Sequence, residues 1–127
     1  MLAALRDAGW TRRTDPVFLQ SFESGNLRWL RSRTDLRLVQ LIDADGLGPN
    51  GRPRPAARWS SSGNCTLYPQ GELPQDFTAA SSFATIAQYA DVIAPWKRYL
   101  IGVDADNRLV PASAFTTLAK QAGLAVH

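Results

Sequence analysis

Short apolar runs that alternate with segments of helical period constrain this chain more than any other feature. Strand-like runs rich in branched aliphatic residues lie at 16–22, 36–42 and 91–96, and another begins at Leu124. Strict alternation of strands and helices predicts right-handed βαβ units and therefore a parallel sheet. The run at 16–22 is apolar until its last residues, which is typical of a strand buried on both faces.

The segments between these runs are predicted to be helices, because their apolar residues recur at spacings of three and four. Residue types that begin or end helices mark their bounds. We expect an opening helix that closes at Gly9, a second helix over 23–33, a third with Thr78 as its N-cap, and a last one capped by Ser113 and closed by Gly123.

The segment 43–75 interrupts the alternation. It is crowded with Gly, Pro, Ser and Asn, and it is long for a connection within a compact domain. It follows the carboxyl end of a predicted strand, which is where parallel α/β proteins place binding loops. We therefore expect a long loop insertion at 43–75 on the functional side of the fold.

Four parallel strands can belong to a small doubly wound sheet or to half of a (β/α)8 barrel, which needs about 250 residues. With 127 residues, the chain has room for one small domain. The chain opens within a helix and stops as the strand at Leu124 begins. We therefore expect an α/β fold, namely part of a (β/α)8 TIM barrel with about four βα units and parallel strands. Residues 1–127 would be a fragment of this single domain.

Composition excludes several kinds of chemistry. One cysteine and one histidine cannot form a disulfide framework, a multi-thiolate zinc site or a pair of imidazoles acting as acid and base. No apolar run approaches the length of about 20 residues that spans a bilayer, so we expect no membrane span. The net charge of +3 comes largely from arginines at 28–37 and 52–58. Because they are not interleaved with aromatic residues, we interpret them as solvated and expect no nucleic-acid partner.

Three superficially attractive motifs fail on inspection. The acidic stretches that begin at Asp43 and Asp104 lack the twelfth-position glutamate of a calcium-binding EF-hand, so we interpret them as turns. Ser21 stands at a strand end but lacks the Gly-x-Ser-x-Gly elbow of a serine hydrolase. Cys65 has no histidine near it in the sequence and is interpreted as incidental.

Polar and aromatic residues close the predicted strands. Gln20, Ser21 and Phe22 end the first strand, and Pro95 and Trp96 end the third. The mouth of a barrel needs such groups at the carboxyl ends of its strands. On composition alone, however, an ordinary strand end explains them as well as a ligand pocket does.

Four sequence segments together resemble a known family. The runs VFLQSF at 17–22, LVQLI at 38–42, YADVIAP at 89–95 and GLAVH at 123–127 resemble, in this order and spacing, the second half of bacterial glycerophosphodiester phosphodiesterases. The likeness is greatest to the periplasmic type, which also has a long excursion after the LVQLI strand. It covers the chain from about Pro16 to its end.

The resemblance implies a (β/α)8 barrel that hydrolyses glycerophosphodiesters to glycerol 3-phosphate and an alcohol, with a bound divalent cation, calcium or magnesium. The family's acid/base histidines and metal ligands would lie upstream of Met1, so we expect no catalytic residue and no metal ligand within this chain. What carries over is a substrate-pocket wall formed by Gln20, Ser21, Phe22, Pro95, Trp96 and His127, with Gln40 either in the wall or in the filling of the barrel.

Further expectations concern the intact protein. The isolated fragment is expected to be inactive and to need the missing barrel half, without which it should self-associate or aggregate. The resemblance implies a periplasmic or secreted parent, although no signal segment is present in this chain. The alternative is a complete small α/β binding module that uses its arginines and long loop to hold an anionic ligand or partner.

Overall fold

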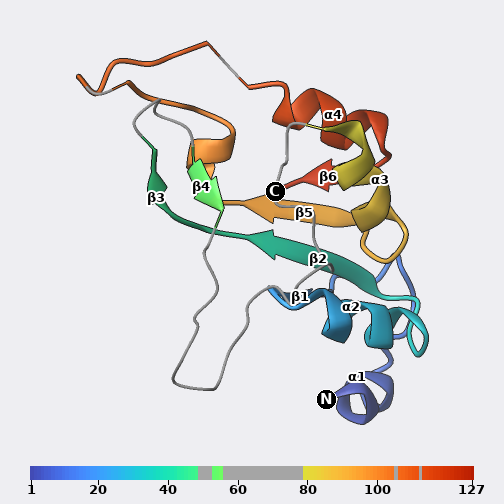
Figure 1. Cartoon of the computed structure of the whole chain (residues 1–127). Coiled ribbons are helices and arrows are strands. Elements are labelled where there is room, and N and C mark those ends of the chain that lie inside the picture. The colour runs from blue at the N-terminus through green and yellow to red at the C-terminus, as the bar shows by residue number, and fades with distance from the viewer. Residues whose placement is uncertain (49–52, 56–78, 105, 112) are drawn as a thin grey trace.

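The computed structural model describes residues 1–48, 53–55, 79–104, 106–111 and 113–127 (Figure 1). The predicted alternation of helices and strands is confirmed, with the addition of a short ribbon and a 3-10 turn. The elements in chain order are α1 (Leu2–Asp7), β1 (Phe18–Ser21), α2 (Ser24–Arg31), β2 (Arg37–Ile42), β3 (Ala44–Leu47), β4 (Pro53–Pro55), α3 (Ala80–Ala87), β5 (Val92–Pro95), the 3-10 helix η1 (Lys97–Tyr99), α4 (Phe115–Gln121) and β6 (Ala125–Val126).

The main sheet is parallel throughout, as predicted. Its strands lie in the order β1-β2-β5-β6, which is also their order along the chain. One cross-strand row joins Gln20 to Val39, Val39 to Val92, and Val92 to Ala125. A doubly wound sheet reverses its strand order partway across. The sheet in the described part of the chain adds each strand on the same side of the previous one, so it is singly wound.

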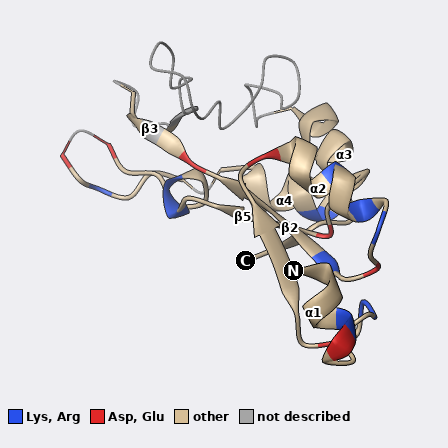
Figure 2. Ribbon diagram, turned by 90° about the horizontal axis from the view of Figure 1, so that it is seen from below, with Lys and Arg blue, Asp and Glu red and all other residues tan. Residues whose placement is uncertain are grey.

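The hydrophobic core lies between one face of this sheet and the helices α2, α3 and α4 (Figure 2). The rings of Phe83 and Phe115 meet edge to face, with their centroids 4.9 Å apart, and so join α3 to α4. Sheet side chains reach the core at alternate positions, as the two-residue period of a strand requires. The buried core residues of the strands and these helices are Leu19, Leu27, Leu30, Leu38, Ile42, Phe83, Ile86, Ile93, Phe115 and Ala119.

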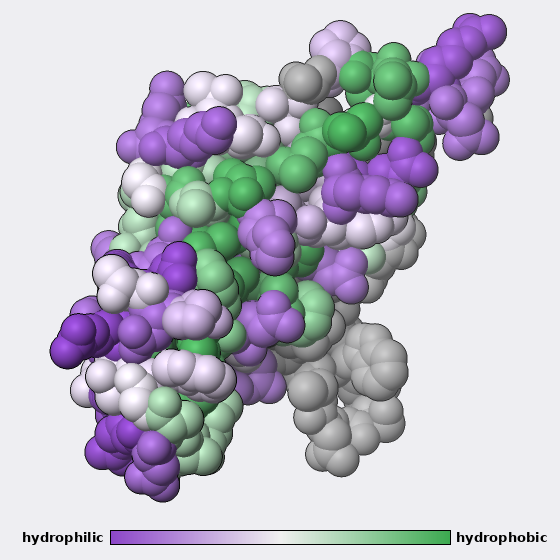
Figure 3. Space-filling model, turned by 180° about the vertical axis from the view of Figure 1, so that it is seen from behind, coloured by the Kyte–Doolittle hydropathy of each residue, from purple (hydrophilic) through white to green (hydrophobic). Residues whose placement is uncertain are grey.

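The opposite face of the sheet, here named the open face, carries the other set of alternating strand residues. Figure 3 views the molecule from this side and shows apolar surface bordered by hydrophilic side chains. Phe18 is 50% exposed and Gln20 is exposed, so the prediction that this run is buried on both faces is wrong for β1. The reason is that all three crossover helices lie on the other face. The open face consists of Phe18, Gln20, Arg37, Val39, Leu41, Val92, Ala94 and Ala125.

Both predicted glycine helix ends are confirmed. Gly9 follows α1 with φ +81°, and Gly123 follows α4 with φ +83°, a left-handed conformation that glycine adopts without strain. After Gly123, the backbone N–H of Leu124 donates to the carbonyl of Ala119 at 3.0 Å. This bond satisfies an otherwise unpaired carbonyl and directs the chain into β6.

The predicted helix starts are displaced by one residue. The N-cap of α3 is Ala79, not Thr78, which lies outside the described residues. The N-cap of α4 is Ala114, not Ser113. The Ser113 hydroxyl nevertheless accepts a hydrogen bond from the Phe115 N–H at 3.3 Å, so it still satisfies one free donor of the first turn.

Residues 43–48 and 53–55 of the predicted insertion at 43–75 lie within the described residues. The strands β3 and β4 form an antiparallel ribbon, with a register shift between Ala44 and Gly46. The prediction that the acidic stretch beginning at Asp43 is a turn is therefore wrong, because Ala44–Leu47 form β3 and pair with β4. The rest of the segment, including Cys65, lies outside the described residues.

The acidic stretch at Asp104 is a turn, as predicted. Its Oδ1 accepts the backbone N–H groups of Asp106 and Arg108, both at 2.9 Å. Asn107 lies between them with φ 60°, a conformation that asparagine tolerates better than most residues. The carboxylate is thus used to close the turn.

Candidate functional site

The carboxyl ends of the four parallel strands meet at one edge of the sheet (Figure 1). This edge carries the predicted pocket wall, because each of the residues concerned lies at or just past a strand end. The structure therefore brings together segments that are more than 100 residues apart in the sequence. The wall residues at this edge are Gln20, Ser21, Phe22, Pro95, Trp96 and His127.

Gln40 belongs to the support of this edge. Its side chain is fully buried on the helix side of β2. Its Nε2 donates to the carbonyls of Phe22 at 2.9 Å, Leu41 at 3.0 Å and Ser21 at 3.4 Å, and its Oε1 accepts the Tyr89 hydroxyl at 2.9 Å. The amide therefore fastens the end of β1 to β2. It faces away from the open face and is not positioned to contact a ligand there.

Ser21 has a local structural role. Its Oγ accepts the backbone N–H of Glu23 at 3.0 Å and so closes the turn that leads into α2. Glu23 in turn accepts a hydrogen bond from the side-chain amide of Asn26 at 2.6 Å. The Ser21 hydroxyl therefore stabilises the backbone of this turn.

The end of β5 is held against the end of β2. Pro95 lies opposite Ile42, and the backbone N–H of Trp96 donates to the Ile42 carbonyl at 2.7 Å. The Trp96 side chain is partly buried and packs against the hydrophobic core. The predicted wall is therefore divided: Gln20 belongs to the open face, whereas Gln40, Pro95 and Trp96 pack toward the helices.

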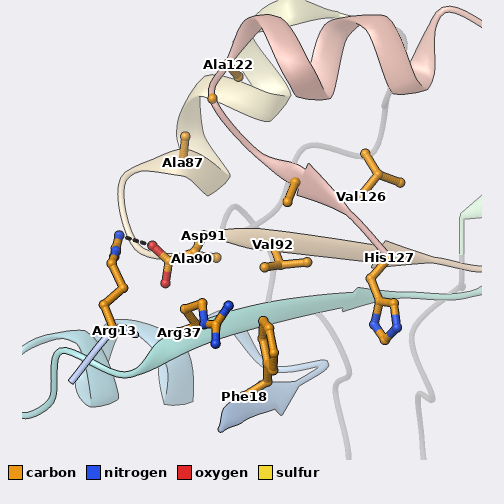
Figure 4. Close-up of a pocket in the computed structure, with 12 residues that line it drawn as sticks. Arg13, Phe18, Arg37, Ala87, Ala90, Asp91, Val92, Ala122, Val126 and His127 are labelled. Carbon is orange, nitrogen blue, oxygen red and sulfur yellow. Dashed lines mark hydrogen bonds and ion pairs between the residues drawn. The ribbon is translucent and has the colours of Figure 1, made fainter. Parts of the chain in front are cut away.

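A cavity of about 550 Å³ opens across the open face (Figure 4). Arg13, Phe18, Arg37, Asp91 and His127 are among its lining residues, and His127 alone comes from the predicted wall. Figure 4 shows Phe18, Arg37, Val92 and His127 projecting from neighbouring strands into this space. The cavity extends from the His127 end of the sheet toward the amino ends of the strands.

Asp91 is the centre of an ionic network at those amino ends. Its carboxylate pairs with the guanidinium groups of Arg13 and Arg31, and its Oδ2 also accepts the backbone N–H of Leu38 at 2.9 Å. Its side chain is only 14% exposed. Sequence reasoning treated Asp91 only as the start of a strand. The sequence signal that could have indicated its ion pairs is a single acidic residue directly before an apolar run, in a chain rich in arginine.

The arginines of 28–37 are not simply solvated. Arg28 and Arg33 are exposed, as predicted, but three of the arginines also place the guanidinium over an aromatic ring. The sequence concealed these contacts because two of the three rings lie on other elements. The stacked pairs are Arg28 over Tyr89 at 4.4 Å, Arg33 over Trp29 at 4.2 Å, and Arg37 over Phe18 at 4.1 Å from the ring centroid.

Asp15 anchors the turn before β1. Its Oδ2 accepts the backbone N–H groups of Arg12 and Thr11, each at 2.7 Å. These hydrogen bonds, chiefly the one from Arg12, hold the pKa of Asp15 below its ordinary value. The Asp15 carbonyl accepts Nη2 of Arg37 at 2.7 Å, so the same turn also positions the cation that lines the cavity.

The residues placed by the structure contain no cluster of three or more His, Cys, Asp or Glu suited to hold a metal ion. They therefore supply no ligand set for the divalent cation that the resemblance implies. None of the described helices is long and apolar enough to cross a membrane. No protein-family model matches the chain, and no curated protein matches it significantly.

Proposed function

We propose that this chain forms about half of the (β/α)8 barrel of a glycerophosphodiester phosphodiesterase and contributes one side of its substrate pocket. One observation carries the proposal. The four segments that carry the family resemblance are four adjacent parallel strands, β1, β2, β5 and β6, in chain order. Repeated addition of βα units in chain order is how a (β/α)8 barrel closes.

The open face, over which no described helix lies, supports the same proposal; Val39 and Val92 at its centre are already buried, whereas Phe18 at its margin is half exposed. Parallel sheets are almost always covered on both faces, and here α2, α3 and α4 all lie on one. In a closed barrel the open face becomes the interior, where apolar residues such as Val39 and Val92 pack in layers. The half-exposed Phe18 would then be buried as well.

In this proposal the chain binds and orients the substrate. Gln20 and His127 are exposed near the carboxyl ends of their strands and have side chains able to hydrogen-bond a glycerol hydroxyl or a phosphate oxygen. Gln40 holds the β1 end that carries Gln20. Cleavage of the phosphodiester to glycerol 3-phosphate and an alcohol would use the metal and acid/base groups of the other barrel half.

The test begins with the open reading frame on both sides of the chain. We expect a His-Arg and a Glu-x-Asp motif upstream and a Pro-aromatic-Thr run directly downstream. The longer protein should hydrolyse glycerophosphocholine, and the purified 127-residue chain should not exceed a metal-free blank. In the longer protein, His127→Ala should lower activity, whereas Gln121→Ala, at an exposed position of α4, should not. Activity of the isolated chain would refute the proposal.

A complete small binding module is the second candidate, and the cavity favours it. Arg37 lines that cavity and forms no ion pair with a carboxylate among the residues the structure places. An anionic ligand could neutralise it. In-frame stop codons on both sides, together with calorimetric binding of inorganic phosphate that Arg37→Leu abolishes, would favour this candidate over the barrel fragment.

A further inference from the structure

The strand residues of the open face carry positive charge and no acid, and the one carboxylate placed at the margin of the same cavity, that of Asp91, is paired with Arg13 and Arg31. These strand residues include Arg37 but neither Asp nor Glu, and His127 continues the same face beyond β6. The remaining members are apolar, apart from Gln20. A surface that covers this face must therefore be apolar over most of its area and must also accommodate the guanidinium of Arg37.

Arg37 is only partly satisfied. Its guanidinium lies over the Phe18 ring, and Nη2 donates to the Asp15 carbonyl at 2.7 Å. Its Nε is buried and has no hydrogen-bond acceptor among the described residues. No ion pair found among the described residues involves Arg37. Covering the face would remove further water from this cation, which is unfavourable unless a counter-charge arrives at the same time.

A second copy of the chain does not supply that counter-charge. A two-fold barrel would join β6 of each copy to β1 of the other and would place the two β2 strands at equivalent positions. Residues of equivalent strands share one interior layer, so the two Arg37 side chains would lie in the same layer. Like charges that are buried together oppose association.

We propose that the open face docks against a parallel βα segment of different sequence, whose inward residues are apolar except for an Asp or Glu that pairs with Arg37. This inference rests on the proposed function, in which that segment is the other half of the barrel. The inference specifies which residue types the docking surface must carry. It also excludes a barrel closed by a second copy of this chain. The carboxylate would lie near the amino ends of the strands, away from the substrate edge.

Sedimentation equilibrium of the 127-residue chain tests the inference without measuring activity. We expect the native chain to self-associate or aggregate without forming a discrete dimer. Arg37→Leu, which keeps an apolar stem and removes the charge, should dimerise about tenfold more tightly or better. Arg108→Leu is the matched control, because that arginine is exposed on a turn and its one ion pair within the described part of the chain is 3.7 Å long. It should behave like the native chain.

A mixing experiment supplies the second measurement. Arg37→Glu should associate with the native chain more tightly than either protein associates with itself. Failure of both Arg37 variants to associate more tightly would overturn the inference. So would a discrete dimer of the native chain as tight as that of Arg37→Leu, and this result needs no variant to fold. Neither result bears on whether the longer protein hydrolyses glycerophosphodiesters, so the two proposals can fail separately.

Discussion

Replacing Gln40 with leucine should destabilise the fold strongly, although the two side chains are similar in volume. The substitution removes the donor to the Phe22 carbonyl and the acceptor of the Tyr89 hydroxyl, both at 2.9 Å in a fully buried place. A buried polar group that loses its partner costs about 1–3 kcal/mol. Two such losses, partly relieved by relaxation, give about 2–4 kcal/mol.

The assay is urea unfolding followed by far-UV circular dichroism, at two protein concentrations so that self-association is recognised. For a chain of this size the loss should lower the urea midpoint by about 1–2 M. Gln121→Leu makes the same side-chain change at an exposed position of α4 and should stay within about 0.5 kcal/mol. A double-mutant cycle with Tyr89→Phe should show coupling of about 0.5–3 kcal/mol. If Gln40→Leu is as harmless as Gln121→Leu, the buried amide does not fasten β1 and the reasoning is wrong.

Three further predictions concern stability. Asp91→Asn should cost about 2 kcal/mol in urea unfolding, because it removes the mostly buried charge that pairs with two arginines, whereas Asp106→Asn, whose pair is exposed, should change little. Gly123→Ala should cost about 1 kcal/mol in the same assay, because no atom lies within 4 Å of an added Cβ and only the positive φ opposes it; no loss would contradict the left-handed helix end. Asp15→Asn should remove stability at neutral pH. Since hydrogen bonds lower the folded pKa of Asp15, its contribution is present above the ordinary carboxylate value of about 3.9 and is lost as pH falls through the folded pKa, so acid titrations of variant and native chain should converge at pH values below that folded pKa.

The elements of the fold could be predicted because they depend on local pattern. Short aliphatic runs and helical spacing can be recognised within about ten residues of sequence. A helix end with positive φ can be recognised from a single glycine. The parallel direction of the strands follows from alternation alone. Helix starts were displaced by one residue because Ala79 and Ala114 cap without a side-chain hydrogen bond, and nothing in the sequence distinguishes such a cap.

The candidate site was harder to predict because it depends on direction and on distant contacts. Gln20 and Gln40 are both polar residues within apolar strands, yet one belongs to the open face and the other is buried among carbonyls. Only the register between β1 and β2 separates them. The Asp91 network joins residues up to 78 positions apart, and no short-range pattern encodes such a contact.

The position of the Asp91 network has a consequence for how this architecture can change over time. The Asp91 ion pairs lie at the amino ends of the strands. The segments that follow the carboxyl ends of the strands are therefore not held in place by these ion pairs. Substitutions at exposed positions of those segments, away from the Gln40 and Trp96 contacts, should then change the surface at this edge with little effect on the unfolding free energy. Such a scaffold can diversify what it recognises while the parts that keep it folded are conserved.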